Sequence, residues 1–166
     1  MKDGIVYGAV IGTILALDQV TKALALIYFK TAPVTVLPFF NLVLVWNKGV
    51  SFGLFNDGMM GPLILAGLSL AITAVLFVWL LRVKHRLLGI ALCFVIAGAI
   101  GNVIDRLRFG AVVDFLDFHA FGYHWPAFNI ADSTIVLGIA FLVIDGLFFE
   151  ANRQKSDTND EKQPAS

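Results

Sequence analysis

Residues 101–132 have the sequence GNVIDRLRFGAVVDFLDFHAFGYHWPAFNIAD, which concentrates polar side chains in an otherwise apolar chain. It contains four acids, Asp105, Asp114, Asp117 and Asp132, and Asn102, Arg106 and Asn129 lie beside them. The whole chain is 58% hydrophobic and only 14% charged, and apolar runs flank the segment on both sides. We therefore expect this segment to carry the function.

The composition indicates a protein whose solvent is lipid. A length of 166 residues suits one ordinary domain, and a mean hydropathy of +0.83 is too high for a water-soluble fold with a polar shell. The formal net charge is zero, so bulk electrostatics favours neither nucleic acid nor an anionic surface as a partner. The single cysteine, Cys93, lies in an apolar run, which excludes a disulfide framework and a cysteine-rich metal site.

Four segments are long and apolar enough to cross a membrane as helices. They cover residues of about 4–29, 61–81, 87–107 and 131–149. The second has no charge from Gly61 to Leu81, which at about 1.5 Å per residue crosses roughly 30 Å of hydrocarbon. The third contains Ala97, Gly98 and Ala99, small residues that permit close helix packing in lipid. The sequence thus predicts a mainly α, polytopic membrane protein with one domain over residues 1–150.

A β-rich segment over about residues 33–56 separates the first two spans. Val34 to Trp46 is rich in β-branched and aromatic residues and is bounded by prolines, which favours short strands and turns. The aromatic residues that suit the headgroup region of a bilayer are Phe39, Phe40, Trp46, Phe52 and Phe55. The Asn-Asp-Gly run at residues 56–58 predicts a turn into the second span, and the polar residues 151–166 predict a disordered cytoplasmic tail.

Basic residues indicate how the spans are oriented, because Lys and Arg in short loops are retained in the cytoplasm. Four spans with both termini inside would place seven basic residues in the cytoplasm and four outside. The cytoplasmic set is Lys2, Arg82, Lys84, Arg86, Arg153, Lys155 and Lys162, and the outer set is Lys30, Lys48, Arg106 and Arg108. This orientation brings Asp18, Asp105 and Asp132 to one level near the outer leaflet.

Two charges interrupt the first span. Asp18 and Lys22 are four residues apart, so they share a helix face on which opposite charges can pair. Pairing reduces the free-energy cost of burying a charge at membrane depth. Two interpretations are open for this pair: a structural ion pair that locks helices together, or a direct part in the chemistry.

Ionisable groups that converge at membrane depth indicate a functional site, since each is costly to bury there. Two neighbouring carboxylates do not both ionise easily, so one can hold a proton while the other acts as a base. This suits amide hydrolysis, in which the base activates water and the acid protonates the carbonyl oxygen and then the leaving nitrogen. The alternative is a small ion or proton transporter with a carboxylate relay. A relay would distribute acids across the membrane, however, and these gather on one side.

Five short motifs occur in order along the chain. They are Asp18-Gln19-Val20-Thr21-Lys22, Asn47-Lys48-Gly49-Val50-Ser51-Phe52-Gly53, Gly101-Asn102-Val103-Ile104-Asp105-Arg106, Val112-Val113-Asp114-Phe115 and Phe128-Asn129-Ile130-Ala131-Asp132. Together they resemble the motif set of bacterial lipoprotein signal peptidase (signal peptidase II), an aspartyl endopeptidase family, over nearly the whole chain apart from its tail. The resemblance implies a membrane peptidase that removes signal peptides from diacylglyceryl-modified prolipoproteins by cutting just before the modified cysteine.

The resemblance also implies a fold, a location and site residues. The fold is four transmembrane helices with a small periplasmic β-cradle and an extramembrane loop or helix, in the bacterial inner membrane, with the active site near the periplasmic leaflet. The catalytic dyad falls on Asp114 and Asp132, and the supporting positions are Asn102, Arg106, Asn129, Asn47, Asp18, Lys22 and Asp105. The expected partners are the diacylated substrate and membrane phospholipid. We expect a monomer that uses no cofactor or metal and binds no nucleic acid.

Local patterns leave alternatives for individual residues. Asn129 can cap the last span with Asp132 three residues further in, because helix N-termini favour both. This role is compatible with catalysis, and it predicts that Asp132 ionises more readily while Asp114 carries the proton. Arg106 can pair with Asp105, contact a lipid phosphate or orient a substrate carbonyl. A structural pair plus a headgroup contact is the favoured interpretation.

Asp114, Asp117, His119 and His124 form a possible metal cluster, because aspartate and histidine are competent zinc ligands. Their spacing matches no recognised pattern, so a solvated interfacial loop is the preferred interpretation. Asp145 lies in the half of the last span far from the dyad and is expected at an interface.

Overall fold

Four long helices dominate the computed structural model, which describes residues 2–49 and 60–148. They are α1 (Lys2–Tyr28), α2 (Met60–Arg82), α3 (Arg86–Phe109) and α4 (Ile130–Phe148). Each is long and apolar enough to cross a membrane. The prediction of four spanning helices is therefore confirmed, and the observed helix ends lie one or two residues from the expected ones.

Helix α3 lies at the centre of the bundle and packs against the other three helices. Most residues of its apolar stretch are buried, whereas α1, α2 and α4 expose most of theirs, as helices surrounded by lipid do. Glycine permits two close approaches to α3. A Cβ atom on Gly98 would collide with the Ala131 carbonyl oxygen of α4, and one on Gly101 would lie 2.6 Å from an Asp18 carboxylate oxygen of α1.

A four-stranded antiparallel sheet adjoins one end of the bundle. Its strands, β1 (Val34–Leu37), β2 (Phe40–Asn47), β3 (Val112–Ala120) and β4 (Tyr123–His124), follow one another in spatial order. The first two strands lie in the predicted β-rich segment. The expectations for Phe52, Phe55, the turn at residues 56–58 and the tail at 151–166 fall outside the described residues.

The sequence did not predict β3 and β4, and the solvated loop expected around Asp114 and Asp117 is wrong. In β3, Asp114 pairs with Val45 of β2 and Asp117 pairs with Asn41. Residues 112–115 are all buried. The strand forms because β2 satisfies its backbone groups and neighbouring elements cover its side chains, neither of which is local in sequence.

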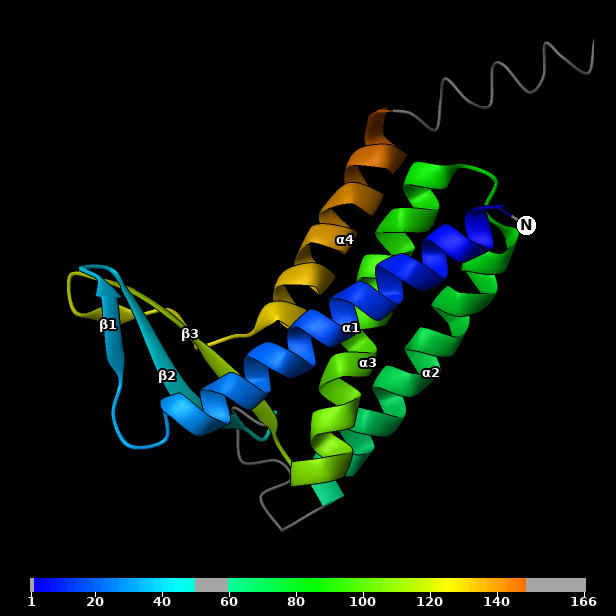
Figure 1. Cartoon of the computed structure of the whole chain (residues 1–166). Coiled ribbons are helices and arrows are strands. Elements are labelled where there is room, and N and C mark those ends of the chain that lie inside the picture. The colour runs from blue at the N-terminus through cyan, green and yellow to red at the C-terminus, as the bar shows by residue number, and fades with distance from the viewer. Residues whose placement is uncertain (1, 50–59, 149–166) are drawn as a thin grey trace, which may run out of the picture.

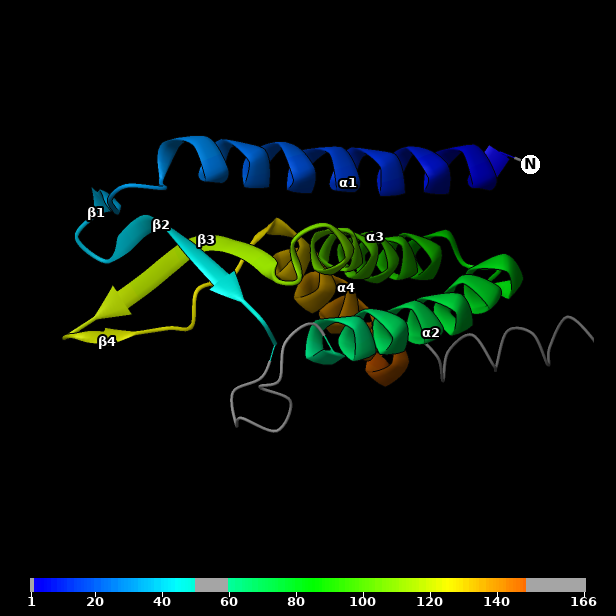
Figure 2. The ribbon, with the colours of Figure 1, turned by 90° about the horizontal axis from the view of Figure 1, so that it is seen from below.

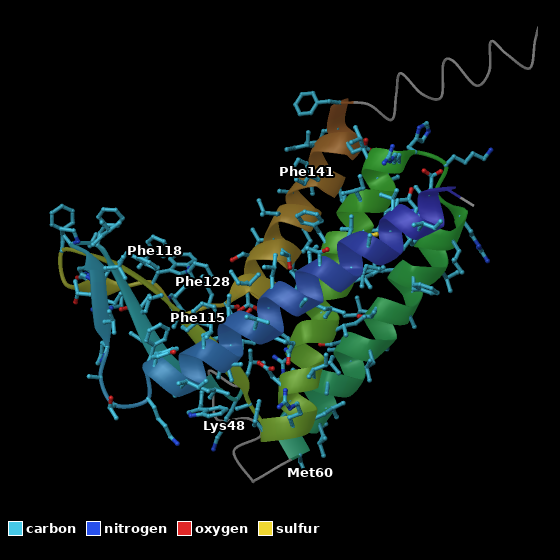
Figure 3. The ribbon with its side chains drawn as sticks, in the orientation of Figure 1. Lys48, Met60, Phe115, Phe118, Phe128 and Phe141 are labelled. Carbon is cyan, nitrogen blue, oxygen red and sulfur yellow. The ribbon has the colours of Figure 1, made fainter. Side chains whose placement is uncertain are left out.

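Backbone bonds tie the segment before α4 to β3. Phe128 donates its N–H to the Leu116 carbonyl at 3.1 Å, and its own carbonyl accepts the N–H groups of Phe115 and Leu116 at 3.0 and 2.9 Å. The Phe128 ring stacks on Phe118 with centroids 5.9 Å apart (Figure 3). The Phe118 ring also contacts Phe40, with centroids 4.7 Å apart and the ring planes tilted by 31°. These contacts bring the start of α4 beside Asp114, 18 residues before Asp132 in the chain.

The start of α1, the connection between α2 and α3, and the end of α4 lie at one end of the bundle (Figure 1). The sheet lies at the opposite end and projects to one side of the helices (Figures 1 and 2). The polar residues of the first, third and fourth spans are thus gathered where helices and sheet meet.

Candidate active site

The first turn of α4 is closed by a reciprocal cap. The Asn129 side-chain oxygen accepts the Asp132 N–H at 2.9 Å, and Asp132 Oδ2 accepts the Asn129 N–H at 3.3 Å. The capping role expected from the sequence is therefore confirmed. It leaves the other Asp132 oxygen, Oδ1, to accept a hydrogen bond from Asn102 Nδ2 at 2.7 Å. Asp132 thus serves the helix end while its carboxylate remains only half-buried.

Asp114 projects from β3 into the same region and is completely buried. Asn129 Nδ2 donates to its Oδ1 at 2.6 Å, and Asn47 Nδ2 donates to its Oδ2 at 2.9 Å. Asn129 therefore contacts both carboxyl groups, that of Asp114 through its side-chain amide nitrogen and that of Asp132 through its backbone N–H. One asparagine links the strand acid to the helix acid.

Burial raises the pKa of the Asp114 carboxyl to about 6. The hydrogen bond from Asn47 acts in the opposite direction, because it stabilises the charged form. The negative charge of Asp132 raises the pKa further, while the bond from Asn129 and the charge of Lys22 lower it. Asp114 is consequently suited to hold a proton in a range where an ordinary aspartate has lost it.

Lys22 occupies the centre of a buried polar cluster beside the two acids. Its side chain is almost fully buried, and its ammonium lies 2.9 Å from Asp18 Oδ2, 3.0 Å from Asp105 Oδ2 and 3.1 Å from Asn102 Oδ1. The ion pair expected between Asp18 and Lys22 is present, and Asp105 joins it from α3. The cluster connects α1 to α3, as the structural interpretation of the pair proposed.

The ammonium of Lys22 also fixes the orientation of Asn102. An ammonium group only donates hydrogen bonds, so the amide that faces it must present its oxygen. The Asn102 NH₂ group is then directed to Asp132. Asn129 Nδ2, at 3.3 Å, bonds to the same Asn102 oxygen and reinforces this orientation. Lys22 therefore acts on Asp132 through Asn102 without touching it.

Asp18 and Asp105, the two carboxylates that pair with Lys22, accept further hydrogen bonds. Asp18 Oδ1 accepts the backbone N–H of Ala131 at 2.9 Å, and Asp105 Oδ2 accepts that of Val113 at 3.0 Å. Gln19 Nε2 bonds to Asp18 Oδ2 at 3.1 Å and to Asp105 Oδ1 at 3.2 Å. These bonds hold the backbone beside Asp132 and Asp114 in place. The sequence interpretation missed Gln19, although an amide in an apolar span next to Asp18 was a signal.

Arg106 does not pair with Asp105, contrary to the favoured sequence interpretation. Consecutive residues on a helix point about 100° apart, and the Asp105 side chain turns to α1 and Lys22. Asp132, Asp114 and Asp105 are all close enough to act electrostatically on the Arg106 guanidinium. Arg106 Nη1 donates to the Asn102 carbonyl at 3.5 Å, and its buried Nε bonds to no residue in the part of the chain described. Its charge is therefore placed on the side of the two acids.

Asp117 belongs to a different cluster from Asp114. The two are three residues apart on a strand, so their side chains lie on opposite faces of the sheet. Asp117 accepts a bond from Asn41 at 3.0 Å and lies 2.8 Å from His124 Nδ1, while the His124 ring stacks on His119 at 4.8 Å. Burial alone would raise the pKa of Asp117, but the bonds from Asn41 and His124 lower it. Residues 2–49 and 60–148 contain no group of three histidine, cysteine, aspartate or glutamate residues placed to hold a metal.

A methyl group at Gly101 tests how tightly this cluster is built. Gly101→Ala puts a Cβ atom 2.6 Å from Asp18 Oδ2, which must displace the carboxylate from Lys22. We expect the free energy of unfolding to fall by about 1–3 kcal/mol, as for other overpacked sites. Thermal unfolding in detergent measures this, with Gly67→Ala as the control because a Cβ atom at Gly67 meets nothing within 4 Å. Equal unfolding temperatures for both variants would contradict the close approach.

The family model for signal peptidase II (SPase II) matches residues 10–148. Several similar proteins are lipoprotein signal peptidases. The one from Methylobacterium radiotolerans is 45% identical over 148 residues, covering 86% of this chain and 85% of the relative. Those from Anaplasma phagocytophilum and Rhodopseudomonas palustris are 41% and 47% identical over 147 and 141 residues. The alignments cover 87% and 80% of this chain, and 94% and 86% of the relatives.

Two solved structures have the same fold. A bacterial membrane enzyme determined by the in meso method at 2.3 Å resolution is 27% identical, with a TM-score of 0.72 over 97% of this chain and 94% of the other. A second, determined by the same method at 1.9 Å, is 30% identical, with a TM-score of 0.73 over 87% and 94%. The arrangement of four helices and a lateral sheet is thus that of a known membrane enzyme.

Proposed function

Because this chain belongs to the signal peptidase II family, we infer that it is a membrane protease that removes signal peptides from prolipoproteins. Family membership gives no support to the ion or proton transporter. We propose Asp114 and Asp132 as the catalytic pair. The observation that supports this assignment is that Asn129 bonds to both carboxyl groups, to Asp114 on β3 through its side-chain amide and to Asp132 on α4 through its backbone N–H.

The different surroundings of Asp132 and Asp114 suit them to different roles in hydrolysis. Asp132, half-buried at a helix N-terminus, acts as the base and takes a proton from water. The water oxygen bonds to the scissile carbonyl carbon, and buried Asp114 gives its proton to the carbonyl oxygen. When the carbon–nitrogen bond breaks, the proton on Asp132 passes to the leaving nitrogen and Asp114 takes a hydroxyl proton back from the intermediate, so that a carboxylic acid and an amine result. The raised pKa of Asp114 supports this assignment of the acid.

The remaining site residues position these groups. Asn47 and Asn129 hold Asp114, and Asn102 holds Asp132. In our proposal, the free donors of Arg106 orient a substrate carbonyl. The supporting cluster that keeps the strand, the helix start and Asn102 together is Asp18, Lys22 and Asp105.

We propose that the substrate carries a diacylglyceryl-modified cysteine and is cut just before it. The helices of this multi-pass protein cross the bacterial inner membrane, and the site lies where helices meet the sheet. Such a place lets acyl chains remain in hydrocarbon while the scissile amide reaches the acids. The expected division of basic residues, seven inside and four outside, supports cytoplasmic termini and a site near the periplasmic leaflet. A monomer surrounded by phospholipid contains every group that this mechanism uses.

Cleavage of a purified substrate tests the proposed function. The protein should release the signal peptide from a diacylated prolipoprotein and leave the same precursor without its lipid intact. Cleavage should continue in the presence of a chelator, since both acid and base are carboxyl groups. Equal cleavage of both precursors would show that the protein does not recognise the lipid. No cleavage of either precursor would contradict the proposed function.

The pH profile should show the proton held by Asp114. Because the acid must be protonated, kcat/KM should fall as pH rises through about 6, the value to which burial raises the Asp114 pKa. Asn47 lowers that pKa by its hydrogen bond, so Asn47→Ala should move the fall to higher pH. Steady-state kinetics in detergent measures both profiles. A fall at the same pH in both proteins would show that another group sets it.

A further inference from the structure

The turn between β3 and β4 holds an aromatic side chain in a conformation that favours glycine. Ala120 and Tyr123 are paired across the turn, and Phe121 and Gly122 between them have φ values of 52° and 81°. Two positive φ values are typical of the tightest hairpin turns, in which small or amide side chains are preferred. A bulky residue at the first position is strained. A bulky side chain held in a strained conformation points to a functional role for that side chain.

Three aromatic side chains in and beside this turn are largely exposed. Phe121 is 102% exposed, Tyr123 is 83% exposed and Trp125 is 69% exposed. No aspartate, glutamate, lysine or arginine occurs from residue 118 to residue 131. An uncharged group of exposed aromatic rings is unfavourable in water and typical of a surface that contacts something apolar.

The position of the β3–β4 turn indicates that its exposed rings contact lipid. The sheet projects sideways from the helices, and its β3–β4 end lies farthest from them (Figures 1 and 2). Because all four helices cross a membrane, lipid surrounds the bundle on the side over which the sheet extends. The exposed rings therefore lie beside the bundle, over the lipid that surrounds it. Tyr123 and Trp125 each combine an apolar ring with one polar group, the combination that bilayer interfaces favour.

We propose that Phe121, Tyr123 and Trp125 insert into the headgroup and upper acyl region of the adjacent leaflet and hold the sheet on the bilayer. The polar edges of Tyr123 and Trp125 remain among the headgroups, and the ring of Phe121 reaches the acyl chains. Asp114 lies on the same strand, β3, that leads to this turn. The contact thus fixes the height of Asp114 relative to the leaflet. This inference concerns a lipid surface and stands independently of the proposed peptidase function.

The depth of Trp125 tests the proposal directly. The chain has three tryptophans, so Trp46→Phe with Trp79→Phe leaves Trp125 as the sole emitter. In phospholipid nanodiscs, lipids brominated near the carbonyl end of their acyl chains should quench its fluorescence, and aqueous iodide should quench it far less than it quenches free tryptophan. Strong quenching by iodide with none by the brominated lipids would overturn the proposal.

Substitutions of Phe121 in this background give matched variants. Phe121→Leu keeps an apolar side chain and should retain quenching by the brominated lipids. Phe121→Asn removes it, and because asparagine tolerates positive φ the fold should be at least as stable in thermal unfolding. Its quenching by brominated lipids should nevertheless drop below that of Phe121→Leu. Equal quenching of the two variants would overturn the role assigned to Phe121.

Discussion

Asp114→Asn and Asp132→Asn should each give a folded protein that leaves uncut, diacylated precursors to accumulate in cells. Each substitution removes one of the two groups that move protons, and general acid–base groups contribute about 10²–10⁴-fold to a rate. The Asp114 carboxyl also receives two amide donors, from Asn47 and Asn129, and an amide in its place accepts only one of them. We expect about 1 kcal/mol lower stability at this position, with the fold retained.

A matched control lies on the same strand. Asp117→Asn changes a carboxyl group three residues from Asp114, on the opposite face of the sheet and bonded to Asn41 and His124. Precursor processing should continue in this variant. Electrophoresis of labelled prolipoproteins separates the cut and uncut forms, and circular dichroism checks the fold. Accumulation in Asp117→Asn equal to that in Asp114→Asn would attribute the effect to the sheet and not to the acid.

Lys22→Met should produce the largest loss of stability in the chain. The methionine side chain has a similar length but no charge, so Asp18 and Asp105 would remain buried without their cation. Removal of one partner from a buried ion pair costs about 3–5 kcal/mol. Asn102 would lose the donor that orients its amide, and we therefore expect cleavage to fall even where the protein remains folded.

Thermal unfolding in detergent measures the loss of stability in Lys22→Met. Two comparisons test whether that loss comes from the buried ion pairs. Lys48→Met removes an exposed lysine and should change stability by less than about 0.5 kcal/mol. The double variant Lys22→Met with Asp105→Asn should lose less than the sum of the two single variants, because it leaves only one carboxylate uncompensated. Additive losses would contradict a direct pairing of these two groups.

The helices could be predicted because their signal is local. An uncharged run such as residues 61–81 predicts a span by its length and hydropathy alone. The pairing of Asp18 with Lys22 and the cap formed by Asn129 and Asp132 follow from spacings of four and three residues along a helix. Each of these features depends on residues within one turn of each other.

The features that sequence reasoning missed depend on distant parts of the chain. Strand β3 contains two acids and aromatic residues without a clear alternation, and its partner β2 precedes it by two helices. Lys22 meets Asp105 and Asn102 across 83 and 80 residues, respectively, which no spacing rule connects. The predicted pairing of Arg106 with Asp105 was wrong because it assumed that residues adjacent in sequence have adjacent side chains. The dyad itself was expected from the motif resemblance and not from local pattern.

Single-turnover cleavage of a purified, diacylated prolipoprotein tests the central proposal most directly. Wild type and Asp117→Asn should release the signal peptide at similar rates, whereas Asp114→Asn and Asp132→Asn should each be slower by at least about a hundredfold. Single turnover excludes product release from the comparison, so the rate reports the chemical step and not the departure of the peptide. Cleavage by either dyad variant at the rate of wild type would contradict the assignment of Asp114 and Asp132 as the catalytic pair.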